Sequence, residues 1–450
     1  MSQPVKGSKG SAAPIRIRDS YVERWLAPAR QLLLMDAAGG VVLLLATCVA
    51  LYLANSQWAP QFAEIWKTRV AIQFGSFVHR GDLHHLVIND GLMTIFFFVV
   101  GLEIKREMVL GELRDPRKAL LPIVAAVGGM IVPAAIYFAL HRQLPSEKGW
   151  PIPMATDIAF VVGLLSLFGS RVPFGLKILL LTLAIVDDLG AVLVIAFLFT
   201  EQLAWEWLGL AGGGLVLALL FNWIGVRRVG IYILIGIVVW FGFLKGGIHP
   251  TVAGVLLGLL TPSRAWLGDE HVAEALAAAK SGGGQDSESH ARTRRIEFAI
   301  RESISPLHRL EMALHPWVSF LIMPLFALAN AGLMFDISNL GHRIAIGVML
   351  GLVVGKPLGV FLFSFLAVKV GATKLPTGVT WRILFGGACL AGIGFTMALF
   401  LNTLSFPPLQ NAKYEAAGKI GVLVGSLASA ILGSLLLLTA PKGDAKPTKG

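Results

Sequence analysis

The chain alternates between long apolar runs and short polar connections, and most of the runs are long enough to cross a membrane. A helix needs roughly 20 apolar residues to span the hydrocarbon core of a bilayer. We predict about twelve spans, at approximately 32–54, 85–103, 118–140, 151–169, 174–199, 205–223, 229–245, 248–261, 313–334, 343–370, 381–404 and 415–440. This pattern predicts an all-α polytopic membrane protein, with the lipid bilayer as its solvent.

Composition and charge support this class. The chain is 55% hydrophobic and only 14% charged, whereas soluble domains carry about 25% charged residues. The net charge of +11 does not indicate a nucleic-acid partner, because the basic residues fall mainly in every second connection and in the two tails. By the positive-inside rule, both termini should be cytoplasmic. The basic residues of these connections include Lys105, Arg114, Arg171, Arg227, Arg264, Arg309, Lys369 and Lys442.

The polar segments divide the chain into a basic arm (1–29), a membrane domain (30–440) and a short tail (441–450). An outer segment, 55–84, contains VAIQFGSFVHRG, which predicts a short hairpin. A long cytoplasmic loop, 262–311, contains a predicted helix, DEHVAEALAAAK, and a flexible SGGGQDSES linker. Cys48 and Cys389 lie inside predicted spans, where we expect small apolar fillers and no disulfide.

Two of the spans are interrupted in sequence. The fourth contains GWPIPMATDIAF, with Pro151 and Pro153 before a polar Thr156–Asp157 pair. The eleventh contains the glycine-rich GGACLAGIGFTMALF. Proline and glycine weaken helices, so we expect both helices to be broken. A broken helix exposes dipole ends at which charged side chains and ions can bind.

Several ionisable residues lie inside the predicted spans, where each costs about 2.5–3.5 kcal/mol on insertion scales. Asp36 and Glu103 lie near helix ends, where solvation would explain them. Asp157 either caps half of a broken helix or takes part in a site. Asp90 is a cap or a cavity residue, and His249 is a bonded interhelical histidine or a ligand.

The adjacent aspartates in LAIVDDLGAV are harder to explain as structure. Consecutive helical residues point about 100° apart, so Asp187 and Asp188 cannot share one partner. Two carboxylates this close in a low dielectric repel each other, so the pair should take up a proton. Their oxygens are also the ligands that sodium and other hard cations prefer. Lys356 could pair with one aspartate until a cation binds. We therefore expect Asp187 and Asp188 to bind either the metal cation or the proton.

Seven motifs together carry a resemblance to a known family: MATDIAF, LAIVDDLGAV, INDGLMTIFFFVVGLEIKRE, KGGIHPTVAG, HPWVSFLIMPLFALANAG, GKPLG and GIGFTMALF. From about Asp36 to Leu438 the chain resembles the NhaA-type sodium/proton antiporters of bacterial inner membranes. The resemblance implies twelve helices in inverted repeats, with two discontinuous helices crossing mid-membrane. It implies electrogenic, pH-dependent exchange of Na⁺ or Li⁺ for H⁺, and no cofactor.

The resemblance also implies roles for individual residues. Asp188 would be the principal ion-binding carboxylate, with Asp187 beside it and paired with Lys356. Thr156 and Asp157 would lie at the helix crossing. A homodimer would form through the outer hairpin, about 68–82. Residues tied to the pH response would be Glu103, Arg106, Glu107, His249 and Glu311. Two departures are the longer loop at 263–304 and His308, where the family pattern predicts lysine.

Two alternatives remain at this point. Asp157 and Asp188 could form an intramembrane aspartyl-protease dyad, which needs two carboxylates sharing a proton. The same fold could also carry an organic solute coupled to sodium. Neither alternative explains the charges as simply as an exchanger, because three acidic residues around one lysine favour a cation site.

Overall fold

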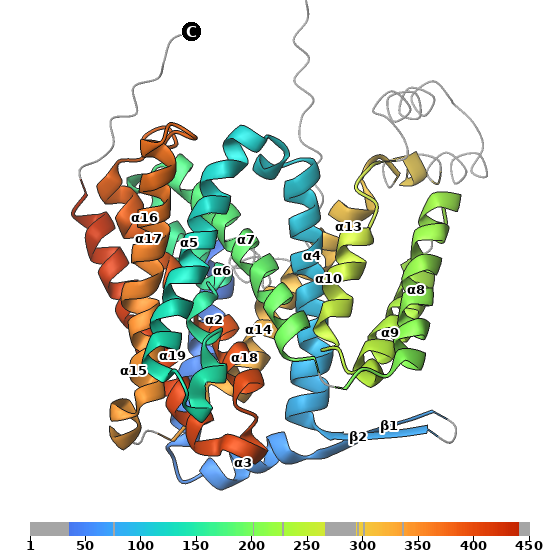
Figure 1. Cartoon of the computed structure of the whole chain (residues 1–450). Coiled ribbons are helices and arrows are strands. Elements are labelled where there is room, and N and C mark those ends of the chain that lie inside the picture. The colour runs from blue at the N-terminus through green and yellow to red at the C-terminus, as the bar shows by residue number, and fades with distance from the viewer. Residues whose placement is uncertain are drawn as a thin grey trace, which may run out of the picture.

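The computed structural model describes residues 36–74, 77–200, 202–226, 229–265, 294, 297–299, 302–334 and 337–440. The basic arm, the tail and the predicted helix DEHVAEALAAAK lie outside the described residues, as does the linker that follows it. In the described part, long helices form one bundle, and a β-hairpin extends from one end of it (Figure 1). The predicted all-α membrane architecture is confirmed.

The elements of the first half of the chain are α2 (Asp36–Ala54), α3 (Ala59–Lys67), β1 (Arg69–Phe74), β2 (Phe77–Asp82), the π-helix η1 (Leu83–Leu92), α4 (Met93–Val109), η2 (Glu112–Arg114), α5 (Pro116–His141), η3 (Pro145–Gly149), η4 (Ile152–Met154), α6 (Ile158–Leu167), η5 (Gly169–Arg171), α7 (Phe174–Leu198) and α8 (Trp205–Ile224). Those of the second half are α9 (Val229–Gly246), α10 (Thr251–Leu260), α13 (Pro306–Trp317), the π-turn η6 (Val318–Ile322), α14 (Met323–Asn330), η7 (Ile337–Gly341), α15 (Arg343–Leu350), the π-turn η8 (Gly351–Gly355), α16 (Lys356–Lys369), α17 (Trp381–Ala391), α18 (Phe395–Ser405) and α19 (Pro408–Leu438).

Every predicted span corresponds to helical elements, but the spans differ in length. Among the described residues, eight helices are long and apolar enough to cross a membrane, or ten if each of two bent pairs counts as one span. The bent pairs are α2 with α3 and α17 with α18, and the shorter apolar helices are α9 and α10. The protein is therefore a multi-pass membrane protein, and the total of twelve spans stays a prediction.

The two interrupted spans are broken where their sequences predicted. In the fourth, η4 ends at Met154, and residues 155–157 are extended before α6 begins. Pro151 and Pro153 lack the N–H groups that a continuous helix needs. In the eleventh, residues 392–394 separate α17 from α18, which meet at a 44° bend. These two breaks contact each other, and this contact forms the centre of the site described below.

The position of α16 depends on a close helix contact. A Cβ atom added to Gly359 of α16 would lie 2.1 Å from the carbonyl oxygen of Gly128 in α5. Only glycine permits this approach of the two backbones. The π-turn η8 directly precedes Lys356 and Pro357, and the proline cannot donate the hydrogen bond of a regular helix. Together these features place Lys356 in the interior, facing α7.

The outer segment contains the predicted hairpin. Strands β1 and β2 pair antiparallel, with Arg69 opposite Asp82 and Phe74 opposite Phe77. Helix α3 precedes the hairpin and turns back from α2 by 114°. Figure 1 shows the hairpin leading into η1 and α4 at the lower end of the bundle. Both cysteines are free thiols; Cys389 is buried, whereas Cys48 is exposed and so does not fill the interior of the bundle.

Candidate functional site

Two broken helices meet through backbone hydrogen bonds. The N–H group of Asp157 donates to the carbonyl oxygen of Ile393 at 2.7 Å. The Thr156 hydroxyl donates to the carbonyl oxygen of Ala391 at 2.8 Å. The extended segment of one break thereby satisfies carbonyl groups that the other break leaves unpaired. The predicted Thr156–Asp157 pair lies at the contact of the two breaks.

Asp157 holds both breaks in place. Its Oδ1 accepts a hydrogen bond from the N–H group of Phe160 at 3.1 Å, so it caps α6. Its Oδ2 accepts from the N–H group of Thr396 at 3.0 Å and also from the Thr396 hydroxyl. Both carboxylate oxygens are therefore engaged at helix N-termini, where a negative charge is favoured. The capping interpretation of Asp157 agrees with this geometry.

Asp187 lies in the middle of α7 and faces the buried lysine. Lys356 Nζ and Asp187 Oδ2 are 2.5 Å apart, and neither side chain is exposed (0% for both). Lys356 also donates to the carbonyl oxygen of Met154, just before the first break. The same Oδ2 accepts the Thr156 hydroxyl at 2.7 Å. One carboxylate therefore joins α7, α16 and the first break.

Asp188 has no such partners. The side chain is buried, and among the described residues no hydrogen-bond partner lies near its Oδ1. The carboxylates of Asp187, Glu103 and Asp157 lie close enough to interact with it electrostatically, and Lys356 is the cation that interacts with it. A buried carboxylate without a partner is unfavourable unless it binds a proton or a cation. Asp188 therefore has the surroundings of an ion ligand.

A cavity approaches this group from one end of the bundle. Its volume is about 710 Å³, and its lining includes Glu107, Arg114, Lys118 and Thr182. Thr182 is buried on α7, six residues before Asp188, which is about 9 Å along a helix. The cavity is lined by charged side chains, and its lining on α7 ends at Thr182, short of the aspartates.

The residues that the resemblance tied to a pH response form two separate groups. In the first, Arg106 pairs with Glu311, and its other guanidinium nitrogen lies 3.5 Å from Glu107. Glu107 Oε2 also accepts the N–H group of Glu112 at 3.1 Å. Glu103 lies one helical turn before Glu107 and interacts electrostatically with Asp188. This group links the cavity mouth to the aspartate pair.

His249 belongs to the second group, near the hairpin end of α4. Its Nε2 is 3.8 Å from Asp90 Oδ1, and its Nδ1 is 2.8 Å from the Thr251 hydroxyl. The Trp240 indole donates to the carbonyl oxygen of Asp90 at 3.0 Å. His249 is thus hydrogen-bonded within its own segment, and the Asp90 carboxylate of η1 lies near its other ring nitrogen. About four helical turns separate Asp90 from Arg106 along the same span.

Sequence reasoning missed several residues that complete these contacts. Thr396 holds Asp157, and the Met154 carbonyl holds Lys356. The parallel between TDIAF and TMALF could have singled out Thr396, because both threonines stand next to a break. The carbonyl of Met154 has no sequence signal. Asp82, His84 and His85, which lie together near the hairpin, were also missed.

The comparisons with known proteins identify the family of the chain. The model of the family Na+/H+ antiporter 1 matches residues 30–437. The chain is 49% identical to the Na(+)/H(+) antiporter NhaA of Rhodopirellula baltica, over 94% of this chain and 96% of that one. It is 47% identical to the Na(+)/H(+) antiporter NhaA 3 of Acidiphilium cryptum, over 93% of this chain and 91% of that one. It is 44% identical to the Na(+)/H(+) antiporter NhaA of Rhizobium meliloti, over 95% of this chain and 98% of that one. The chain belongs to the Na+/H+ antiporter 1 family.

Proposed function

We propose that this transporter exchanges Na⁺ for H⁺ at Asp188, with Asp187 and Lys356 as the neighbouring charge pair. The observation that carries the proposal is the buried Asp188 carboxylate, which lacks a hydrogen-bond partner for Oδ1 among the described residues. Its partner-free oxygen lies beside an ion-paired aspartate in a family of sodium/proton antiporters. A proton or a sodium ion supplies the missing positive charge equally well, which is the basis of competition between them.

The charges around the site support this competition. Asp187 and Lys356 form a neutral pair, and Asp157 is held by helix N-termini. The charge that remains without compensation is that of Asp188. Sodium needs several oxygen ligands, and the nearby candidates are the carboxylates of Asp187 and Asp188 and the Thr156 hydroxyl. When Na⁺ binds, Asp187 turns from Lys356 towards the ion; when Na⁺ leaves, the ion pair re-forms.

Alternating access follows from the broken helices. The two breaks are joined by a small number of hydrogen bonds around Thr156, Asp157 and Thr396, so that half-helices can move as units on either side of the contact. Exchange is electrogenic if more protons enter than sodium ions leave. The membrane potential then contributes about 2.3 kcal/mol per net charge per 100 mV. Li⁺ is a smaller hard cation and uses the same oxygen ligands.

The surroundings of the site support a pH response. Arg106, Glu107 and Glu311 form a charged cluster at the cavity mouth, and Glu103 connects it to Asp188. Protons that bind to this cluster alter the field at the ion site. His249 acts in its separate group with Asp90. His308, whose Nδ1 is 3.8 Å from Glu311 Oε2, stands beside this cluster at the position where the family pattern predicts lysine.

The organisation around the membrane domain forms part of the proposal. The basic arm (1–29), the long loop (262–311) and the tail (441–450) lie on the cytoplasmic side, and the outer segment 55–84 lies on the other. The charge distribution supports this orientation in a bacterial inner membrane. The hairpin extends from the bundle end and presents unpaired strand edges, which supports a homodimer formed through residues 68–82 (Figure 1).

Transport by an Asp188→Asn variant tests the proposal. Proteoliposomes with an internal pH dye and an acid interior should show alkalinisation on addition of Na⁺ or Li⁺, and much less on addition of K⁺. Asp188→Asn should abolish the response. Glu415→Gln is the matched control, because Glu415 is a buried carboxylate in a separate ion pair with Lys419. Full activity of Asp188→Asn would refute the site assignment.

The two alternatives give different results in the same preparation. A protease dyad needs a proton shared between Asp157 and Asp188, but both oxygens of Asp157 are already engaged at helix N-termini. The family is a transporter family, so the chain is not an enzyme. A sodium-coupled organic solute carrier would show sodium-stimulated uptake of an organic anion. Such uptake, with no proton movement, would replace the exchange proposal.

A further inference from the structure

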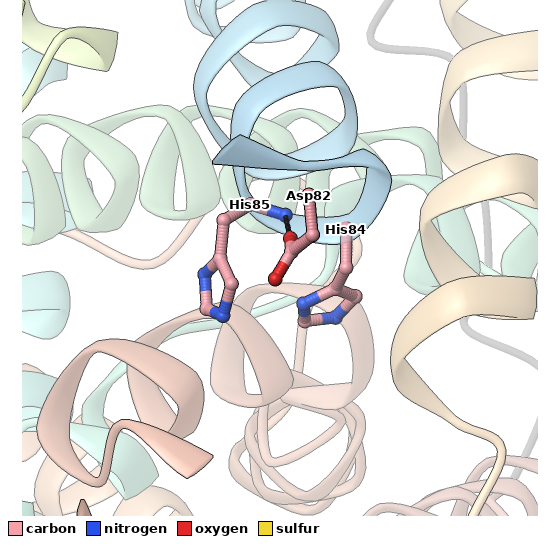
Figure 2. Close-up of side chains that lie close together, drawn as sticks. All are labelled: Asp82, His84 and His85. Carbon is pink, nitrogen blue, oxygen red and sulfur yellow. Dashed lines mark hydrogen bonds between the residues drawn. The ribbon is translucent and has the colours of Figure 1, made fainter. Parts of the chain in front are cut away.

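A cluster of Asp82, His84 and His85 lies where β2 passes into η1, at the hairpin end of the bundle. One ligand atom from each residue lies within 4.8 Å of the other two, and all three side chains are half-buried. Figure 2 shows the Asp82 carboxylate between the two imidazole rings. This is the only group of three such side chains found in the part of the chain that the structure describes. Ion exchange at Asp188 makes no use of it.

The backbone organises the cluster before any ligand binds. Asp82 caps the first turn of η1, because one carboxylate oxygen accepts the N–H group of His85 at 2.7 Å. This leaves the second carboxylate oxygen for another partner. The rings of His84 and His85 are nearly perpendicular, at 86°, with centroids 5.0 Å apart. Nearly perpendicular rings on either side of the carboxylate can direct nitrogen lone pairs towards a common point without stacking on each other.

Asn330 determines which nitrogen of His84 is available. Its amide nitrogen donates to the carbonyl oxygen of Phe326 at 3.1 Å, so its Oδ1 is the acceptor. That Oδ1 lies 3.0 Å from His84 Nε2, which must therefore carry the proton. The lone pair of His84 is then on Nδ1. Histidines that bind metals usually donate their other ring N–H group to an oxygen in this way.

We propose that Asp82, His84 and His85 bind a divalent transition-metal ion of the Zn²⁺ class. Two imidazoles and one carboxylate are typical ligands of an open zinc site, with water in the fourth position. Ligand atoms around tetrahedral Zn²⁺ are about 3.4 Å apart, whereas those of the cluster lie within 4.8 Å of one another. Small side-chain rotations that move the ligand atoms by about 1 Å would bring them to the spacing that Zn²⁺ needs. Mg²⁺ and Ca²⁺ require six or more oxygen ligands, which this cluster lacks.

The lysine that interacts with His84 does not prevent binding. Lys419 interacts electrostatically with His84, but its ammonium group pairs with Glu415 at 2.7 Å. The site therefore faces an ion pair and not an isolated positive charge. A metal ion held here would join the end of the hairpin to the first turn of η1, which continues into α4, and through Asn330 to α14.

Calorimetric titration of the purified, tag-free protein with ZnCl₂ tests this proposal. The wild type should bind one Zn²⁺ per chain with an affinity that Asp82→Asn and His85→Gln each reduce by at least about tenfold. Asp82→Asn keeps an N-cap residue, so the fold of η1 is retained. His342→Gln is the matched control: His342 also caps a helix and lies outside the cluster. The affinity of the His342→Gln variant for Zn²⁺ should equal that of the wild type.

A second measurement covers the case in which a variant folds poorly. Thermal unfolding of the wild type should shift upwards with Zn²⁺ and not with equal Mg²⁺, because a ligand of the folded state stabilises it. Absence of Zn²⁺ binding by the wild type would overturn the proposal, and so would equal affinity in Asp82→Asn and His85→Gln. Binding is measured without transport, so either result is independent of ion exchange.

Discussion

The buried pair of Lys356 and Asp187 allows a quantitative prediction. Lys356→Met removes the cation and leaves the Asp187 carboxylate with only the Thr156 hydroxyl. Removal of one member of a buried pair costs about 3–5 kcal/mol. The carbonyl of Met154 also loses its donor, which adds about 1 kcal/mol. We therefore expect Lys356→Met to lower the free energy of unfolding by about 5 kcal/mol.

A double variant separates the cost of the unpaired Asp187 charge from the cost of the hydrogen bond lost by the Met154 carbonyl. When Asp187→Asn is added to Lys356→Met, the amide oxygen of the new side chain still accepts from Thr156, and no charge is left behind. The loss in free energy of unfolding should then be only about 1 kcal/mol, because only the Met154 carbonyl still lacks its donor. A second substitution should thus recover about 4 kcal/mol, which is a non-additive effect expected only of residues in contact.

Equilibrium unfolding in mixed detergent micelles, followed by circular dichroism at 222 nm, measures these differences. Lys419→Met is the matched control, because Lys419 is also buried and paired, 2.7 Å from Glu415, but lies far along the chain from α7. Asp187→Asn should add to Lys419→Met without rescue. If the double variant of Lys356 and Asp187 is no more stable than Lys356→Met within about 0.5 kcal/mol, the two side chains are not a buried pair.

Two further predictions use the same unfolding measurement. Asp157→Ala removes an N-cap and the hydrogen bonds to α18, and should lower the free energy of unfolding by about 3 kcal/mol. Asp115→Ala removes only the cap of α5 and should lower it by about 1 kcal/mol. Equal losses in the two variants would contradict the role of Asp157 at both breaks. Gly359→Ala places a Cβ 2.1 Å from a carbonyl oxygen of α5 and should cost about 1–3 kcal/mol, whereas Gly212→Ala meets no atom within 4 Å and should be neutral or stabilising. If Gly359→Ala is neutral, the helices do not approach as closely as described.

Local patterns predicted the local features. Apolar length indicated the spans, and alternation indicated the hairpin that β1 and β2 form. Proline and glycine indicated the two broken helices, because both residues act on the backbone hydrogen bonds of their own segment. The number of spans was less certain, since α2 and α3 meet at a 114° bend and α9 and α10 are short. A length criterion does not resolve such elements.

Contacts between distant segments needed the structure. The reach of Lys356 to Asp187 depends on the close packing of Gly359 against Gly128, which are separated by more than 200 positions in the chain. No periodicity in either helix encodes that distance. The partner of Asp157 on α18, Thr396, lies 239 residues away. Charge type pointed to the site and the family resemblance implied the pairing of Lys356 with Asp187, whereas Thr396 and the Met154 carbonyl became known as partners only from the structure.

The difference between the two aspartates is the main lesson of the site. Adjacent helical residues point about 100° apart, so a single partner serves only one of them. Lys356 and Thr156 contact Oδ2 of Asp187, whereas Oδ1 of Asp187 and Oδ1 of Asp188 both lack a hydrogen-bond partner among the described residues. The same lysine that stabilises one carboxylate thus leaves the net negative charge on the other. The two adjacent aspartates are therefore unequal: Asp187 is joined to Lys356 and Thr156, and Asp188 is the carboxylate at which we propose ion exchange.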